Sequence, residues 1–275
     1  MTPEIGVLVV HGIGVQRRET VAVDFIAAMS DRLERLGAAP GLVAWEVAYW
    51  ADILDPREEE LFARLAAGGD LDWVRLRRFF VSFFADAIAY RREPTQDADV
   101  YDAIHGRVLG ALRRLRARLG DRDRPLVVLA HSLGSVIASN YVWDEQRPNE
   151  KARGSNAFER TETLAGLVTF GSPIPLFTLA LRTVVSIAFP PPTLPAHLAA
   201  AARWLNFYDP DDVLGWPLMP LSPTYERAVT EDRAINVGGP LTSWNPLSHE
   251  GYWTDPDFMA PAAELIRSVL LAGRR

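Results

Sequence analysis

Apolar runs rich in β-branched residues recur along the chain and are separated by more polar stretches. Six of these runs predict strands: Ile5–Val10, Leu42–Ala48, Leu126–Ala130, Leu164–Phe170, Trp204–Tyr208 and Ala234–Val237. Most of them are continuously apolar and do not alternate with polar residues. Such a pattern is typical of strands that are covered on both faces of a sheet.

Three other stretches have the three-to-four-residue spacing of amphipathic helices. Their apolar positions are Val21, Phe25, Met29 and Leu33, then Val100, Ile104, Val108 and Leu112, and finally Leu265, Ile266, Val269 and Leu270. Strands that alternate with helices predict an α/β fold, with a doubly wound, mostly parallel sheet flanked by helices. We expect residues 1–275 to form a single domain.

Two segments do not fit this alternation and are predicted to be insertions, near residues 52–92 and 174–197. The first contains Trp73, Phe79, Phe80, Phe83 and Phe84. The second is an apolar, helix-like run that ends in three consecutive prolines. Both are expected to be helical, lid-like additions to the domain.

Composition narrows the function classes. The 275 residues are 48% hydrophobic and 23% charged, which is typical of a globular protein. The absence of cysteine excludes disulfides, thiolate metal sites and thiol nucleophiles. A net charge of −6 argues against nonspecific nucleic-acid binding. No targeting segment is recognisable, and the longest apolar stretch, Ile174–Phe189, is short for a membrane span. We therefore expect a cytoplasmic protein.

The stretch Leu126–Ser135 reads as a strand, a sharp turn and a helix. Its turn has the pattern small-x-Ser-x-Gly, with Ala130 and Gly134 two residues on either side of Ser132. This context is that of a nucleophile elbow, which places the serine hydroxyl at the carboxyl end of a strand. Ligands of open α/β sheets bind at that edge. A serine in a merely structural turn is the alternative interpretation.

A serine nucleophile needs backbone N–H donors for the oxyanion that forms during acyl transfer. Leu133 follows the serine and predicts the first donor. The glycine-flanked turn after the first strand predicts the second, with Ile13 favoured over Gly12. A phosphate-binding loop is the alternative, but the stretch lacks the third glycine and the acidic residue that such a loop requires.

The general base is predicted to be His249, because the order serine, acid, histidine is typical of this arrangement. Of the five histidines, His249 alone follows the serine with aspartates at the end of a predicted strand in between. Asp212 is the predicted acid, Asp209 the second choice and Asp211 the third. Turn-forming or helix-capping roles for all three stay open, whereas the spacing does not match an EF-hand calcium loop.

These residues resemble the α/β-hydrolase superfamily, and more narrowly its bacterial serine esterases and lipases related to the inositol-deacylase-like group. The motifs that carry the resemblance are Val10-His-Gly-Ile-Gly14, Ala130-His-Ser-Leu-Gly134, Phe170-Gly-Ser-Pro173, Asp209-Pro-Asp-Asp-Val213 and Ser248-His-Glu-Gly-Tyr252. The resemblance implies hydrolysis of a small-molecule or lipid ester through an acyl-enzyme, without a cofactor or metal. Lipases of the group carry the acid in an Asp-Val or Asp-Ile loop, which supports Asp212.

Within this interpretation the two insertions are the expected substrate-determining parts. Phe80, Phe84, Leu176 and Phe177 are predicted to line a lid or an acyl-binding wall, although an aromatic stripe on a helix more often belongs to the core. Arginines beside the first aromatic group would suit weak contact with a membrane surface. Two other functions stay open: a catalytically silent binding module, and an acyltransferase or amidase with the same triad.

Overall fold

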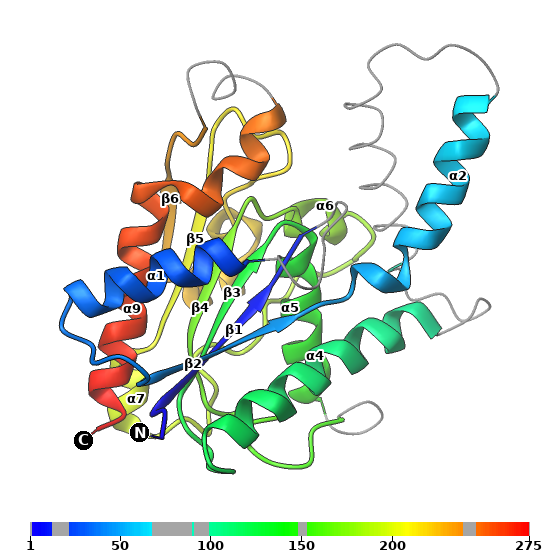
Figure 1. Cartoon of the computed structure of the whole chain (residues 1–275). Coiled ribbons are helices and arrows are strands. Elements are labelled where there is room, and N and C mark those ends of the chain that lie inside the picture. The colour runs from blue at the N-terminus through cyan, green and yellow to red at the C-terminus, as the bar shows by residue number, and fades with distance from the viewer. Residues whose placement is uncertain are drawn as a thin grey trace.

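The computed structural model describes residues 2–12, 22–67, 90, 99–147, 153–238 and 246–274. One six-stranded sheet runs through the molecule in the order β2-β1-β3-β4-β5-β6, and every neighbouring pair is parallel (Figure 1). The strands are β1 Ile5–Val10, β2 Val43–Ala48, β3 Leu126–His131, β4 Leu164–Phe170, β5 Arg203–Tyr208 and β6 Glu231–Ala234.

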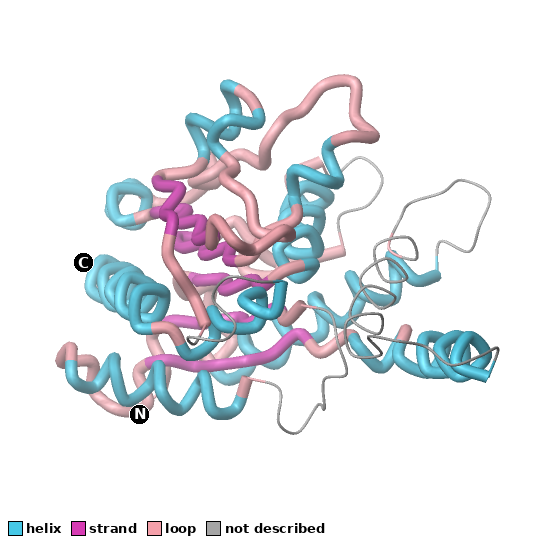
Figure 2. The backbone as a smooth tube through the Cα atoms, turned by 90° about the horizontal axis from the view of Figure 1, so that it is seen from above, coloured by secondary structure: helices cyan, strands magenta, loops and turns pink. Residues whose placement is uncertain are grey.

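Helices cover both faces of the sheet (Figure 2). On one face α1 (Val23–Arg35) packs against α9 (Pro256–Ala272), and on the other α4 (Asp99–Arg118) packs against α5 (Leu133–Glu145). The shorter elements are η1 Ala51–Ile53, α2 Asp55–Ala67, α6 Ile174–Thr178, α7 Ala196–Ala201, η2 Met219–Leu221, α8 Pro223–Ala228 and η3 Pro246–Thr254. This doubly wound, α/β-hydrolase-like arrangement confirms the fold class predicted from the sequence.

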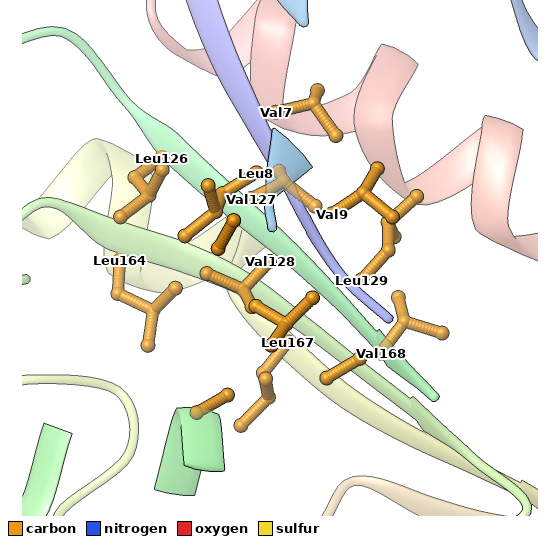
Figure 3. Packing of buried hydrophobic residues seen from close by; sticks show 14 of the residues in the cluster. Val7, Leu8, Val9, Leu126, Val127, Val128, Leu129, Leu164, Leu167 and Val168 are labelled. Atoms are coloured by element: carbon orange, nitrogen blue, oxygen red, sulfur yellow. The ribbon is translucent and has the colours of Figure 1, made fainter. Parts of the chain in front are cut away.

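The core lies along the three central strands, whose residues are all buried. Val9, Leu129 and Val168 are in register on β1, β3 and β4, so their side chains form one row across the sheet (Figure 3). Each fully buried side chain of this size stabilises the fold by roughly 1.5–3 kcal/mol. The central strands are therefore firmly held.

The predicted helix spacing is confirmed where it can be compared. Phe25, Met29 and Leu33 are buried on α1, while Val21 lies outside the described residues. The apolar positions of α4 and of α9 are likewise buried. Each of these helices thus turns its apolar stripe toward the sheet.

The last strand differs from the prediction. It covers Glu231–Ala234 and not Ala234–Val237. β6 pairs only with β5, so as an edge strand it carries polar residues that an apolar pattern does not reveal. Ile235 and Val237 are buried nevertheless, because they follow the strand into the interior beside the loop after β5.

The second insertion is also less helical than predicted. Only α6 and α7 are helical between residues 174 and 201, and the chain between them is irregular. Prolines at 190, 191, 192 and 195 lack the N–H that a helix requires. Side-chain bonds replace the missing helix: the Gln146 amide bonds both backbone groups of Ala188.

The first insertion is described only in part. It starts with η1 and α2, and α2 projects away from the sheet (Figure 1). The aromatic residues predicted to face substrate there, Phe80 and Phe84, lie outside the described residues, as do Trp73, Phe79 and Phe83. Across the described ranges, no helix combines the length and the apolar content needed to cross a membrane.

Candidate active site

The sheet topology creates a switch point at the carboxyl ends of its central strands. The chain leaves β1 toward β2 and returns to β3 on the other side of β1. The connections after these two strands therefore diverge to opposite faces of the sheet, and such a switch point is where open α/β sheets bind ligands. His11 and Gly12 follow β1, and Ser132 follows β3.

Ser132 occupies a strained turn between β3 and α5. Its φ is 52° and its ψ is −131°, in a region that side chains other than glycine rarely adopt. The turn brings the first residues of α5 against β1. A side-chain carbon built at Gly134 would lie 2.4 Å from the carbonyl oxygen of Val10 and 2.5 Å from that of His11. Only glycine fits this close approach.

Ser132, His249 and Asp212 form one chain of hydrogen bonds. The Nε2 atom of His249 lies 2.7 Å from the Ser132 Oγ, and its Nδ1 lies 2.8 Å from the Asp212 Oδ2. All three side chains are buried. The structure thus brings together the predicted nucleophile, base and first-choice acid, which lie up to 117 residues apart in the sequence.

The Asp212 carboxylate is ionised in this setting. Burial acts to raise its pKa, but hydrogen bonds and the charge of His249 act in the opposite direction, and the pKa is lowered overall. The Tyr252 hydroxyl donates to Oδ2 at 2.9 Å, and the Leu214 N–H donates to Oδ1 at 3.0 Å. An ionised acceptor on Nδ1 requires the proton there, which leaves the Nε2 lone pair of His249 facing the serine.

The two other candidate acids have different roles in the loop. Asp209 is buried, and its carboxylate accepts the N–H groups of Asp211 and Val237, both at 2.7 Å. Asp211 itself is exposed. Asp209 thus closes the loop that carries Asp212, and the structure brings neither it nor Asp211 to His249.

The oxyanion side is described in part. Leu133 is the first residue of α5, where backbone N–H groups have no partner within the helix. Gly12 lies directly against Ser132, since a side-chain carbon there would be 2.7 Å from the Ser132 Cβ. Ile13, the favoured second donor, lies outside the described residues.

His11 and Trp50 hold the start of this loop. Their rings stack with centroids 5.1 Å apart, and the indole Nε1–H of Trp50 donates to the His11 carbonyl at 3.1 Å. The Nδ1 of His11 bonds the Gly12 carbonyl at 2.7 Å, while its Nε2 accepts the Trp50 N–H. Burial lowers the pKa of His11 to about 4. His11 is thus a neutral side chain that holds the start of this loop against Trp50. Apart from the His-Gly pair, the sequence does not indicate this role.

Tyr252 is a second residue of the site that was not predicted from the sequence. Its hydroxyl accepts the Asp209 N–H at 2.8 Å while it donates to Asp212, so that it ties η3 to the loop after β5. Burial and the Asp212 charge raise the pKa of this phenol, which stays a donor. Its position three residues after His249 in one short 3₁₀ helix is the signal that could have identified it.

Leu176 and Phe177, predicted to contact substrate, lie on α6. This helix follows Ser172, whose Oγ is 2.7 Å from the Oγ of Ser135 on α5. Leu176 is exposed and Phe177 is half-buried against the core. α6 therefore starts beside the first turn of α5, and a substrate-contacting role for both residues stays a prediction.

A cavity of about 760 Å³ lies elsewhere, between Glu145 at the end of α5 and the irregular segment 185–193. Ser132 precedes the other end of that helix, so this cavity is separate from the hydrogen-bonded chain. No group of three or more His, Asp or Glu side chains suited to a metal ion occurs among the residues described.

Comparisons with family models, curated proteins and solved structures assign no role to the residues of this site. No protein-family model matches the chain, and no curated protein matches it either. One similar solved structure comes from work on LipS and LipT, two metagenome-derived lipolytic enzymes. It is 15% identical, the similarity covers 97% of this chain and 95% of that one, and the TM-score is 0.42. The α/β-hydrolase-like fold rests on the strand order and the turn at Ser132.

Proposed function

We propose that this protein is a serine hydrolase that cleaves carboxylic esters through Ser132, His249 and Asp212. The observation that carries the proposal is the continuous hydrogen-bonded chain from the Ser132 Oγ through both ring nitrogens of His249 to Asp212. Because Asp212 holds the Nδ1 proton, Nε2 is available to accept the serine proton.

In the proposed reaction the Ser132 Oγ attacks the ester carbonyl carbon while its proton passes to Nε2 of His249. The negative charge on the carbonyl oxygen is stabilised by the N–H of Leu133 and by a donor from the loop after β1. Collapse of the tetrahedral intermediate breaks the bond to the alcohol, which leaves with the proton from His249. His249 then takes a proton from a water molecule, whose oxygen attacks the carbonyl carbon of the acyl-serine. The bond to the Ser132 Oγ breaks, His249 returns the proton to Oγ, and the acid is released.

The substrate side of the proposal places the acyl group against apolar side chains near Ser132. Leu176 and Phe177 on α6, with Phe80 and Phe84 of the first insertion, are the proposed contacts. Binding sites for small molecules are largely apolar with few polar anchors, which is the composition of segment 174–197. A small-molecule or lipid ester is therefore the proposed substrate class.

Hydrolysis of p-nitrophenyl esters from acetate to palmitate, by wild type and Ser132→Ala side by side, tests the proposal. Wild type is expected to hydrolyse part of the series, and Ser132→Ala to lower kcat by on the order of 10⁴ or more with an unchanged circular dichroism spectrum. Activity that survives in Ser132→Ala would remove the serine from the mechanism. A folded wild type that hydrolyses no ester would favour an amidase, an acyltransferase or a silent binding module.

A further inference from the structure

His131, the residue before the nucleophile, is buried but stands outside the hydrogen-bonded chain of the proposed triad. Its Nε2 lies 2.9 Å from the main-chain carbonyl oxygen of His249. A carbonyl oxygen can only accept, so Nε2 carries the proton and donates it. One histidine side chain thus bonds the backbone of the other.

Aromatic rings surround His131. Its ring centroid is 4.8 Å from that of His249, 5.0 Å from Phe170 and 5.3 Å from Trp253. Burial, and then the charge that His249 can carry, hold the pKa of His131 well below its ordinary value. A neutral His131 matters for the reaction, because a cation at this distance would oppose the imidazolium that forms on His249.

The other edge of the His131 ring faces the loop after β1. A side-chain carbon built at Gly12 would be 2.8 Å from the Nδ1 of His131. The ring therefore fills the space between that loop and η3, directly beside Ser132. His131 is the last residue of β3, which is fully buried and pairs with a strand on each side.

We propose that His131 is a positioning residue that anchors the backbone of η3 and so keeps the His249 ring within hydrogen-bond distance of Ser132. This inference rests on the proposed function. The two ring bonds of His249 orient its side chain, and the bond from His131 fixes the main chain from which that side chain extends. A displacement of about 1 Å in a reacting group can cost on the order of 10² in rate.

Three substitutions separate this role from simple packing. His131→Gln can present an amide N–H near the former Nε2–H, whereas His131→Leu fills a similar volume without a donor. In His131→Asn the amide is too short to reach the His249 carbonyl, which provides a second donor-free variant if the leucine variant does not fold. We expect kcat for a short p-nitrophenyl ester to fall about 10- to 100-fold in His131→Leu and His131→Asn, with KM within about 3-fold of the wild-type value. In His131→Gln we expect kcat to stay within about 5-fold of the wild-type value.

A merely structural role would lower the melting temperature of all three variants but would not separate Gln from Leu and Asn in kcat at 25 °C. Equal kcat in Leu, Asn and wild type, or a Gln variant as slow as the other two, would overturn the positioning role. Nitrogen-15 imidazole NMR of the wild type gives a second readout that needs no substrate. A neutral Nε2–H tautomer at pH 7 is expected, and an Nδ1–H or doubly protonated ring would contradict the proposal.

Labelling of Ser132 by a fluorophosphonate distinguishes failure of this inference from failure of the proposed function. If wild type is labelled but cleaves no ester, the proposed ester hydrolysis is wrong. The positioning role of His131 is then tested by the rate at which the fluorophosphonate labels Ser132 in each variant. Labelling about 10-fold slower in Leu and Asn than in Gln supports positioning, and equal rates exclude it. A wild type that is neither labelled nor active overturns both proposals.

Discussion

At the scale of single residues, the partners of each carboxylate decide which aspartate after β5 can serve His249. Asp212 receives the ring Nδ1–H, a phenol and one backbone N–H, whereas Asp209 receives two backbone N–H groups. Asparagine at 212 can place an amide donor against Nδ1, which favours the wrong tautomer of His249.

We therefore expect Asp212→Asn to lower kcat by on the order of 10² to 10⁴ in protein that is still folded at 25 °C. Asp209→Asn is the matched variant. It keeps the hydrogen bonds of His249 but weakens the acceptors for Asp211 and Val237, so it should lower the free energy of unfolding by about 1–3 kcal/mol while kcat at 25 °C stays within a few-fold. Ester hydrolysis and urea unfolding of both variants measure this. Loss of kcat in Asp209→Asn at unchanged stability would reverse the assignment.

The sequence indicates those candidate residues that a local motif or the order along the chain identifies. Ser132 was predicted from its turn, His249 from its order along the chain, and Asp212 from the Asp-Val pattern of the resemblance. The three side chains are hydrogen-bonded to one another, and their catalytic roles stay a proposal. Tyr252, His11 and the contact of His131 with the His249 carbonyl were not found. Their effect depends on hydrogen bonds across the sheet edge, and no local pattern encodes a bond between residues 39 to 118 positions apart.

At the scale of elements, the close contact between the first turn of α5 and the end of β1 determines where the nucleophile sits. A methyl group at 134 would meet two backbone carbonyl oxygens, of Val10 and His11, neither of which can swing aside as a flexible side chain would. The strand or the helix must therefore move, and Ser132 moves with the helix.

Gly134→Ala is accordingly expected to lower the free energy of unfolding by about 2 kcal/mol or more, as overpacking in a core does, and to lower kcat in the protein that remains folded. Gly106→Ala on α4 is the control. A methyl group there meets nothing within 4 Å, and alanine in a helix is favoured over glycine by about 0.5–1 kcal/mol, so this variant should be stabilised. Thermal unfolding of both proteins measures the difference. A Gly134→Ala variant as stable as wild type would show that the contact is not tight.

Element prediction succeeded where burial is complete and failed where it is not. The fully buried strands β1, β3 and β4 produce continuous apolar runs, and two of them were placed to the residue. β6 is half-covered, so its polar residues hid it and the apolar residues beyond it were taken for the strand. In the second insertion, side-chain bonds such as those of Gln146 support an irregular chain that apolar composition made look helical.

At the scale of the whole molecule, strand order was the step that sequence pattern could not supply. Alternating strands and helices imply a parallel sheet, but many orders satisfy that pattern. The order β2-β1-β3-β4-β5-β6 brings the ends of β1, β3 and β5 to one edge, where the residues of the proposed site meet. Neither the periodicity nor the resemblance to α/β-hydrolases was used to predict a strand order, which the structure supplies.

The same edge buries two neutral imidazoles, His11 and His131, and this affects stability across the whole molecule. Burial lowers the pKa of His11 to about 4 and that of His131 well below its ordinary value of 6.5. Between pH 6.5 and 4 the unfolded chain therefore binds protons that the folded chain does not bind. By linkage, the contribution of these two histidines to the free energy of unfolding falls as the pH is lowered through this range.

For His11 the difference of about 2.5 pKa units corresponds to roughly 3 kcal/mol lost between pH 6.5 and 4. Asp212 acts in a separate window: its pKa is lowered, so its contribution is present above about pH 3.8 and is lost only below it. Urea unfolding at pH 7, 6, 5 and 4.5 is expected to show a steady decline that is shallower in His11→Asn. His197→Gln, at an exposed position on α7, should keep the wild-type slope because that side chain is in solvent in both states. A free energy of unfolding that stays constant from pH 6.5 to 4.5 would mean that His11 and His131 are not held neutral, and would remove the electrostatic part of the argument for His131.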